Sequence, residues 1–109
     1  MRIMHETILE ININRLKSNF KYLKGKLKAK TKIIAVMKAY AYGHGDIVLG
    51  KKLEEFGAHA LWVADFEEGS RLRESGIQIP IIIANPGTKS TQKIIENKLE
   101  VVIYNFKLL

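Results

Sequence analysis

Hydrophobic residues follow two alternating patterns along this chain. Short runs of Ile, Val, Leu and Ala are typical of strands buried on both faces, and they begin near Ile33, Leu61, Ile81 and Val101. Between them, hydrophobic residues lie three or four positions apart, as on one face of an amphipathic helix. From residue 33 onward the pattern predicts βαβαβαβ, and therefore an α/β fold with a parallel sheet and right-handed crossovers.

Before residue 33 the pattern predicts one strand and one helix. Residues 7–13 partly alternate between hydrophobic and polar, which favours an opening strand. Asn12 or Asn14 can cap the helix that follows, and Gly25 lies where that helix can end. Its hydrophobic face would consist of Ile13, Leu16, Phe20, Leu23 and Leu27.

The crossover helices carry start and stop signals. Asp46 is placed to cap a helix over residues 47–56, and Gly57 ends it. Asp65 and Glu68 have the D-x-x-E spacing of a second helix start.

The third crossover helix and the last strand complete the predicted pattern. Thr88 or Ser90 would cap the helix, with Ile94 and Ile95 facing inward. Residues 99–104 would form the fourth core strand. Four such strands make either half of a barrel or a small open sheet, since a closed (β/α)₈ barrel needs eight strands and typically about 250 residues.

Lys38 is the first candidate for chemistry, because it ends the hydrophobic run that starts at Ile33. The carboxyl edge of a parallel sheet is where α/β folds keep their reactive groups. A lysine there can be a Schiff-base amine, a phosphate ligand or an ordinary surface residue, and its position alone leaves these alternatives open. Residues 43–46 form no P-loop and no dinucleotide-binding glycine fingerprint.

Charge and composition argue against a nucleic-acid-binding, a secreted and a membrane protein. The net charge of +7 lies entirely in residues 1–37, where lysines interleave with few aromatic residues and no nucleic-acid-binding motif, so we expect a solvated helix and no nucleic-acid partner. The chain has no cysteine, no signal-peptide pattern and no hydrophobic window of membrane-spanning length. We therefore expect a cytoplasmic protein without disulfides and without a membrane partner.

The segment 36–45, Val-Met-Lys-Ala-Tyr-Ala-Tyr-Gly-His-Gly, resembles the pyridoxal-phosphate attachment motif of the alanine racemase family, V-x-K-A-[N/D]-A-Y-G-H-G. Residues 7–16, 58–64, 67–68, 72–77 and 80–83 also resemble that family, so the likeness covers nearly the whole chain. The motif departs from the family at Tyr40, where asparagine is usual. This departure bears on substrate detail more than on cofactor binding.

The resemblance implies a partial (β/α)₈ TIM-type barrel. Family members combine such a barrel with a mostly β C-terminal domain and work as homodimers. Residues 1–109 would then form a single incomplete barrel domain, with the opening strand and helix in residues 1–32 and the first four barrel strands in residues 33–109. The C-terminal β domain would be absent.

The resemblance also implies an enzyme, a racemase that interconverts L- and D-alanine with pyridoxal 5′-phosphate and supplies D-alanine for peptidoglycan. Lys38 would bind the cofactor covalently and transfer the α-proton on one face, and the Tyr42 hydroxyl would bind the cofactor phosphate. A tyrosine of the partner subunit's C-terminal domain serves the opposite face in the family. We therefore expect little turnover by the 109-residue chain alone. Two alternatives are a truncated or vestigial half-barrel that binds the cofactor without turnover, and another barrel-type pyridoxal-phosphate enzyme such as a decarboxylase.

Other residues near the motif have simpler interpretations. Gly43 and Gly45 permit positive φ, and His44 is expected to make structural hydrogen bonds rather than act as a base. Ile82 and Ala84 share one strand face and could line a cofactor, although core packing explains them equally.

Acidic residues and the remaining histidines are expected to be structural. Asp65, Glu67 and Glu68 fit the start of a helix better than an acid–base pair. His5 and His59 have no partner in the sequence pattern, which predicts that they lie on the surface.

Overall fold

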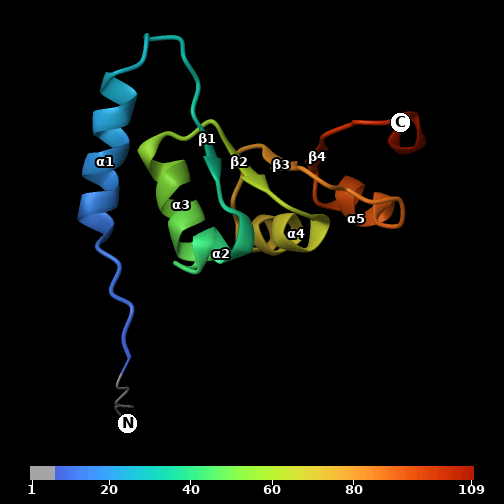
Figure 1. Ribbon diagram of the computed structural model, residues 1–109, viewed down its shortest axis with the longest axis horizontal. Helices are drawn as coiled ribbons and strands as arrows, with labels where there is room; N and C mark the ends of the chain where they lie inside the picture. The colour runs from blue at the N-terminus through green and yellow to red at the C-terminus, as the bar shows by residue number, and fades with distance from the viewer. Residues whose placement is uncertain (1–6) are drawn as a thin grey trace.

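The computed structural model describes residues 7–109 and consists of four short parallel strands with helices between them (Figure 1). The elements are α1 (Ile13–Gly25), β1 (Ile34–Val36), α2 (Lys38–Tyr42), α3 (Asp46–Phe56), β2 (Ala60–Val63), α4 (Phe66–Glu74), β3 (Ile81–Ile83), α5 (Thr91–Glu96), β4 (Glu100–Val101) and the 3₁₀ turn η1 (Phe106–Leu108). The alternation of strands and helices predicted from residue 33 onward is confirmed.

The sheet has the order β1-β2-β3-β4, with every neighbouring pair parallel. Its register places Val36 beside Trp62, and Trp62 beside Ile82. Consecutive strands that lie side by side in chain order are the arrangement expected of one segment of a (β/α)₈ barrel. All the carboxyl ends therefore meet at one edge, where β1 leads into Lys38.

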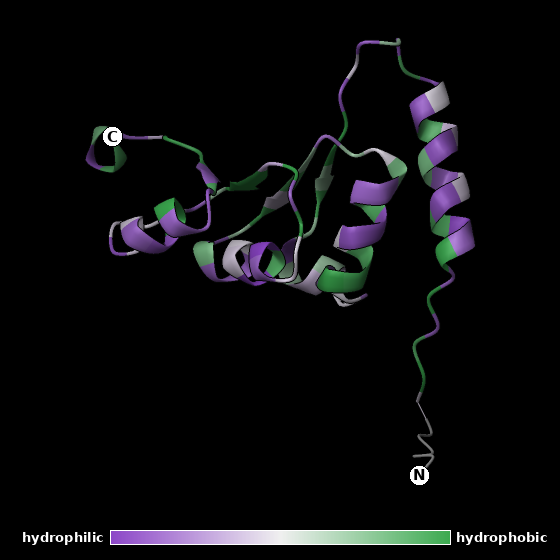
Figure 2. Ribbon diagram, turned by 180° about the vertical axis from the view of Figure 1, so that it is seen from behind, coloured by the Kyte–Doolittle hydropathy of each residue, from purple (hydrophilic) through white to green (hydrophobic). Residues whose placement is uncertain are grey.

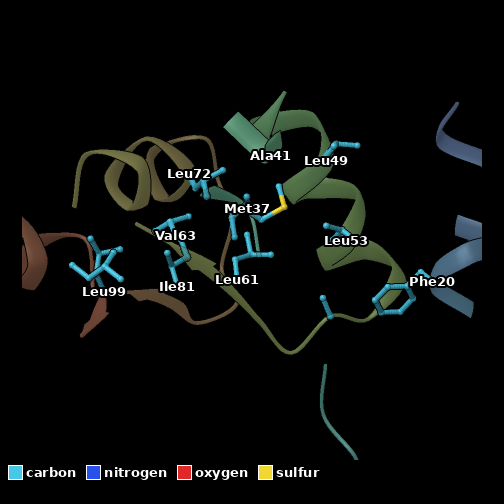
Figure 3. Packing of buried hydrophobic residues seen from close by; sticks show 13 residues of the cluster. Phe20, Met37, Ala41, Leu49, Leu53, Leu61, Val63, Leu72, Ile81 and Leu99 are labelled. Atoms are coloured by element: carbon cyan, nitrogen blue, oxygen red, sulfur yellow. The ribbon is translucent and has the colours of Figure 1, made fainter. Parts of the chain in front are cut away.

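One face of the sheet holds the core, between the strands and helices α3 and α4 (Figure 3). Leu61, Val63 and Ile81 are fully buried on that face, and they pack with Leu53 of α3 and Leu72 of α4. The amphipathic spacing of the helices explains this layer, because it directs one hydrophobic stripe of each helix onto the sheet.

The opposite face of the sheet is open, which corrects the prediction of a first strand buried on both faces. The exposed fractions of Ile34 and Val36 are 49% and 46%, whereas Leu61 and Val63 are at 0%. Residues Ile34 and Val36 of β1 are exposed because the helices cover only the other face of the sheet. A continuous hydrophobic run thus identified the strand correctly but not the burial of its two faces.

The predicted opening strand over residues 7–13 is wrong. Residues 7–12 belong to no helix or strand, and α1 begins directly at Ile13, with Asn12 as its N-cap. The side chain of Asn12 accepts a hydrogen bond from the backbone N–H of Arg15 at 3.1 Å. A strand needs a neighbour to pair its backbone groups, and residues 7–12 pair with none of the four strands of the sheet.

Helix α1 uses only part of its predicted hydrophobic face. Phe20 is buried, with its ring centroid 6.2 Å from that of Phe56 on α3, whereas Leu23 and Leu27 are exposed. Polar and hydrophobic residues alternate along α1 in Figure 2.

Within residues 7–109, no helix combines the length and the hydrophobicity needed to cross a bilayer.

The last elements are shorter than predicted. Strand β4 comprises Glu100–Val101 instead of residues 99–104, because the backbone leaves the sheet after Val102 donates to Ile83 O at 3.1 Å. In α5, Ile94 packs against the core, but Ile95 is exposed, contrary to the prediction. Consecutive residues of an α-helix point about 100° apart, so Ile94 and Ile95 do not both face the core.

Candidate active site at the carboxyl edge of the sheet

Lys38 lies two residues after Val36, at the carboxyl end of β1, as predicted. The preceding residue, Met37, is 2% exposed, and its backbone N–H donates to Trp62 O at 2.8 Å. This anchor fixes the backbone at the point where the chain leaves the sheet. The Lys38 side chain itself is exposed at that edge.

The four residues after Lys38 form a left-handed turn that the sequence did not predict. Ala39, Tyr40, Ala41 and Tyr42 have φ between 52° and 58°, a region that costs a non-glycine residue about 1–2 kcal/mol. The turn is closed by backbone hydrogen bonds from Gly43 N–H to Ala39 O at 2.9 Å and from Gly45 N–H to Tyr40 O at 2.8 Å. Its interior methyl group, on Ala41, belongs to the core.

This turn brings together the two site residues proposed from the sequence. The Lys38 Nζ atom lies 5.9 Å from the centroid of the Tyr42 ring, within the range of a cation–π contact. The exposed fraction of Tyr42 is 61%, so its hydroxyl is open to solvent or to a ligand. An amine and a tyrosine ring therefore lie next to each other at the edge where parallel sheets hold their ligands.

The glycines and the histidine of the motif have structural roles in the turn. Gly43 and Gly45 have φ of 85° and 98°, which confirms the predicted need for positive φ. The Nδ1 atom of His44 lies 2.9 Å from Ala41 O, so a protonated Nδ1 donates to that carbonyl. This bond agrees with the structural interpretation of His44.

The sequence did not predict the ion pair that lies next to the turn. Asp46 is not the N-cap of α3, which is Gly45, but its first helical residue, and its carboxylate is 2% exposed. Arg71 of α4 binds both carboxylate oxygens at 3.2 Å, and its guanidinium carbon lies 5.0 Å from the centroid of the Tyr40 ring. Tyr40, the residue that departs from the family motif, thus packs on the arginine that neutralises Asp46. Nothing local in the sequence links residues 46 and 71.

Glu68 was assigned to a helix start, and the structure gives it a further role. Asp65 is the N-cap of α4 and accepts from the Glu68 N–H at 3.0 Å, as the D-x-x-E spacing predicts. The Glu68 carboxylate, however, binds the backbone N–H groups of Ala39 and Ala64 at 2.7 and 2.8 Å. The D-x-x-E spacing indicated that carboxylates would bind backbone N–H groups at the helix start. It could not indicate that Glu68 binds the N–H of Ala39, which is 29 residues away.

The remaining candidates lie as follows. Glu67 is exposed in the first turn of α4, consistent with a helix-start charge. His59 is exposed as predicted, but its Nδ1 accepts from the Ile33 N–H at 3.2 Å, so it has a partner that the sequence did not indicate. His5 lies outside the described residues. Ile82 and Ala84 are half-buried, and Ile82 lies on the open face beside Trp62.

We expect Asp46→Asn to lower the free energy of unfolding by about 1–3 kcal/mol. The amide has the same shape, but its NH₂ group would face the donors of Arg71. Urea unfolding followed by circular dichroism measures the change. Glu55→Gln is the matched control, because Glu55 pairs with Lys52 at 3.1 Å on an exposed surface and should change stability by less than about 0.5 kcal/mol. Equal effects of the two substitutions would contradict the importance of the pair between the buried Asp46 and Arg71.

Comparisons with known proteins point to one family. A family model described as the alanine racemase N-terminal domain matches residues 11–109. Alanine racemase 2 of Bacillus subtilis is 39% identical over 76% of the chain, and the alanine racemase of Methanococcus maripaludis is 33% identical over 97% of it. The chain spans 21% and 29% of the lengths of these two relatives.

Solved structures of the same family have the same fold over most of the chain. The alanine racemase of Clostridium difficile 630 superposes with a TM-score of 0.83, at 36% identity over 86% of this chain and 25% of that one. An alanine racemase from Bacillus anthracis with bound L-Ala-P gives a TM-score of 0.80, at 29% identity over 84% of this chain and 24% of that one. Together with the family model matched over residues 11–109, these likenesses establish that the chain belongs to the alanine racemase N-terminal domain family.

Proposed function

We propose that this chain supplies the cofactor-attachment part of the active site of an alanine racemase, a pyridoxal-phosphate-dependent enzyme that interconverts L- and D-alanine and provides D-alanine for peptidoglycan. The observation that carries the proposal is the pairing of Lys38 with Tyr42, with the amine 5.9 Å from the ring, at the carboxyl edge of the sheet. Membership of the family supports the reaction and the substrate.

The residues at this edge fit pyridoxal phosphate chemically. A lysine amine can bind an aldehyde covalently, and a tyrosine hydroxyl can donate a hydrogen bond to a phosphate oxygen. Val36, Trp62 and Ile82 share the open face of the sheet next to Lys38, and their side chains could pack against an aromatic ring. We assign covalent attachment to Lys38 and phosphate binding to Tyr42.

Lys38 would also transfer a proton. Its Nζ must be neutral to accept the α-proton of alanine, and the same atom can return the proton to one face of the substrate. When bound, pyridoxal phosphate supplies the electron sink for the electron pair left at the α-carbon. Met37, held by its bond to Trp62 O, and the left-handed turn fix the backbone on either side of this amine.

The opposite face of the substrate needs a second group. We assign it to a tyrosine of a partner subunit, as in the family resemblance, so that the protein works as a homodimer. In the same proposal, residues 33–109 contribute the first four strands of an eight-stranded barrel, residues 1–32 precede it, and the protein resides in the cytoplasm. The second candidate is cofactor binding without turnover, which the open face of the sheet favours, with Ile34 and Val36 half-exposed.

Titration of the chain with pyridoxal phosphate, followed by visible absorbance, tests cofactor binding. We expect saturation at one cofactor per chain, and the absence of a saturable band would contradict the proposal. Incubation with L-alanine and chiral chromatography for D-alanine then distinguishes turnover from binding alone.

Tyr42→Phe should weaken cofactor binding by about tenfold to a hundredfold, because it removes one hydrogen bond to a charged phosphate, worth about 1.5–3 kcal/mol. The same absorbance titration gives the affinity. Tyr22→Phe is the control, since Tyr22 is an exposed residue of α1, and it should leave the affinity unchanged. Binding by Tyr42→Phe as tight as that of the unmodified chain would contradict the assignment of Tyr42 to the phosphate.

A further inference from the structure

The Glu68 side chain joins the two backbone segments that leave the sheet at β1 and β2. Its Oε2 accepts from the Ala39 N–H at 2.7 Å, and its Oε1 accepts from the Ala64 N–H at 2.8 Å. Ala39 directly follows Lys38, and Ala64 directly follows β2. One carboxylate of α4 therefore ties the start of the left-handed turn to the end of the neighbouring strand.

The hydrogen bonds of Glu68 hold a part of the backbone whose φ angles are energetically unfavourable. Four successive residues of the turn have positive φ, at a cost of about 1–2 kcal/mol each, so the surrounding structure must hold them. Hydrogen bonds to an ionised carboxylate are roughly twice as strong as those between neutral groups. Glu68 is half-buried and is anchored by its own N–H, which donates to Asp65 Oδ1 at 3.0 Å.

Lys38 lies between two fixed points. On one side, Met37 is buried and its N–H binds Trp62 O at 2.8 Å; on the other side, the Ala39 N–H binds Glu68. We propose that Glu68 is a positioning residue for Lys38, which holds the left-handed turn and thereby directs the Lys38 amine toward the Tyr42 ring. This inference rests on the proposed function, because positioning has a purpose only if Lys38 binds the cofactor.

The role requires a carboxylate. The two N–H donors bind different oxygens of Glu68, whereas a glutamine side chain has one acceptor oxygen and one donor NH₂ group. In Glu68→Gln, the NH₂ group would face the N–H of Ala39 or of Ala64 while the side-chain volume stays the same. The substitution therefore weakens the link without creating a cavity.

The chain offers a matched control at the other edge of the sheet. Oε2 of Glu54, on α3, accepts from the backbone N–H groups of Gln78 and Ile79 at 2.7 and 2.9 Å. These residues precede β3, so they lie at the amino ends of the strands, away from Lys38. Glu54→Gln removes the charge of another half-buried carboxylate that binds two backbone N–H groups, in this case through one oxygen, and it does not affect the turn.

Two measurements on the 109-residue chain test the proposal. The first is amide hydrogen exchange at Ala39 without cofactor, which we expect to become about tenfold faster in Glu68→Gln or more. The second is borohydride reduction in the presence of pyridoxal phosphate, followed by peptide mapping of the label on Lys38. We expect the rate of Lys38 labelling to fall about tenfold in Glu68→Gln and to stay at the unmodified rate in Glu54→Gln.

The outcomes separate the two proposals. Unchanged exchange at Ala39 in Glu68→Gln would overturn the positioning role, and so would faster exchange with unchanged labelling of Lys38. No labelling of Lys38 in the unmodified chain would contradict the proposed function instead, and the exchange comparison, which needs no cofactor, would still show whether Glu68 holds the turn. If Glu68→Gln fails to fold, Glu68→Asp gives the same comparison, since its shorter side chain keeps the charge but cannot reach both amides.

Discussion

Replacing Lys38 by arginine is expected to abolish the saturable binding of pyridoxal phosphate to this chain. Arginine keeps a positive charge at the carboxyl end of β1, but its guanidinium stays protonated and does not attack an aldehyde. The Lys38 side chain is exposed, so the substitution should leave the fold intact. Visible absorbance measures cofactor binding, and circular dichroism confirms that the variant remains folded.

Lys51→Arg is the matched control for this substitution. Lys51 is an exposed lysine of α3, and its replacement should preserve both the affinity and the stoichiometry of binding. If Lys38→Arg bound the cofactor as tightly as Lys51→Arg, the amine at the end of β1 would not be the attachment site.

The largest effect on stability is expected for Arg73→Ala. The guanidinium of Arg73 donates to four backbone carbonyls, those of Asn97 at 2.8 Å, Ile77 at 2.8 Å, Ile79 at 3.0 Å and Lys98 at 3.1 Å. These bonds tie the segment before β3 to the segment before β4. Because hydrogen bonds to charged groups contribute about 1.5–3 kcal/mol and several acceptors lose their partner at once, we expect the free energy of unfolding to fall by about 2–4 kcal/mol.

Burial lowers the pKa of Arg73 from its usual value, while the nearby carboxylates of Glu54 and Glu100 raise it. A lowered pKa in the folded state means that the unfolded chain binds more protons near that pKa, so this group makes stability rise with pH only at strongly alkaline pH. Arg73 is protonated at neutral pH in both states. The loss caused by Arg73→Ala should therefore be the same at pH 6 and at pH 8, because both values lie far below the usual arginine pKa.

Urea unfolding at both pH values measures this loss. Arg15→Ala is the control, because the Arg15 side chain is exposed on α1, and it should change stability by about 0.5 kcal/mol or less. A change in Arg73→Ala no larger than that of the control would show that the four carbonyls are satisfied without the guanidinium.

The helix ends and the strands could be predicted, because residue types at or near each of them in the sequence indicate them. Asn12 caps α1, Gly57 ends α3 with φ of 106°, and Asp65 caps α4, each at the position that its residue type indicates. Hydrophobic runs identified the four strands, and their alternation with helices predicted a parallel sheet. The strand predicted over residues 7–13 was wrong because a strand also needs a neighbouring strand to pair with, and an alternating pattern does not show whether one is present.

The site was predictable as a motif but not as a geometry. Lys38 and Tyr42 were named from the sequence, and the structure places them side by side. The left-handed turn between them could not be predicted, because alanine and tyrosine do not favour positive φ and the turn depends on contacts from α4. Those contacts come from Glu68, which binds the Ala39 N–H, and from Arg71, which packs on the Tyr40 ring, and both partners are distant in the sequence.

The chain contains fourteen lysines that could react with the aldehyde of pyridoxal phosphate, and we propose that Lys38 is the one that binds it. Borohydride reduction at one cofactor per chain, proteolysis and mass spectrometry identify the residue that carries the label. We expect the label to lie almost entirely on the peptide that contains Lys38. A label spread over the exposed lysines of α1, such as Lys17, Lys21 and Lys24, with no excess on Lys38, would contradict it.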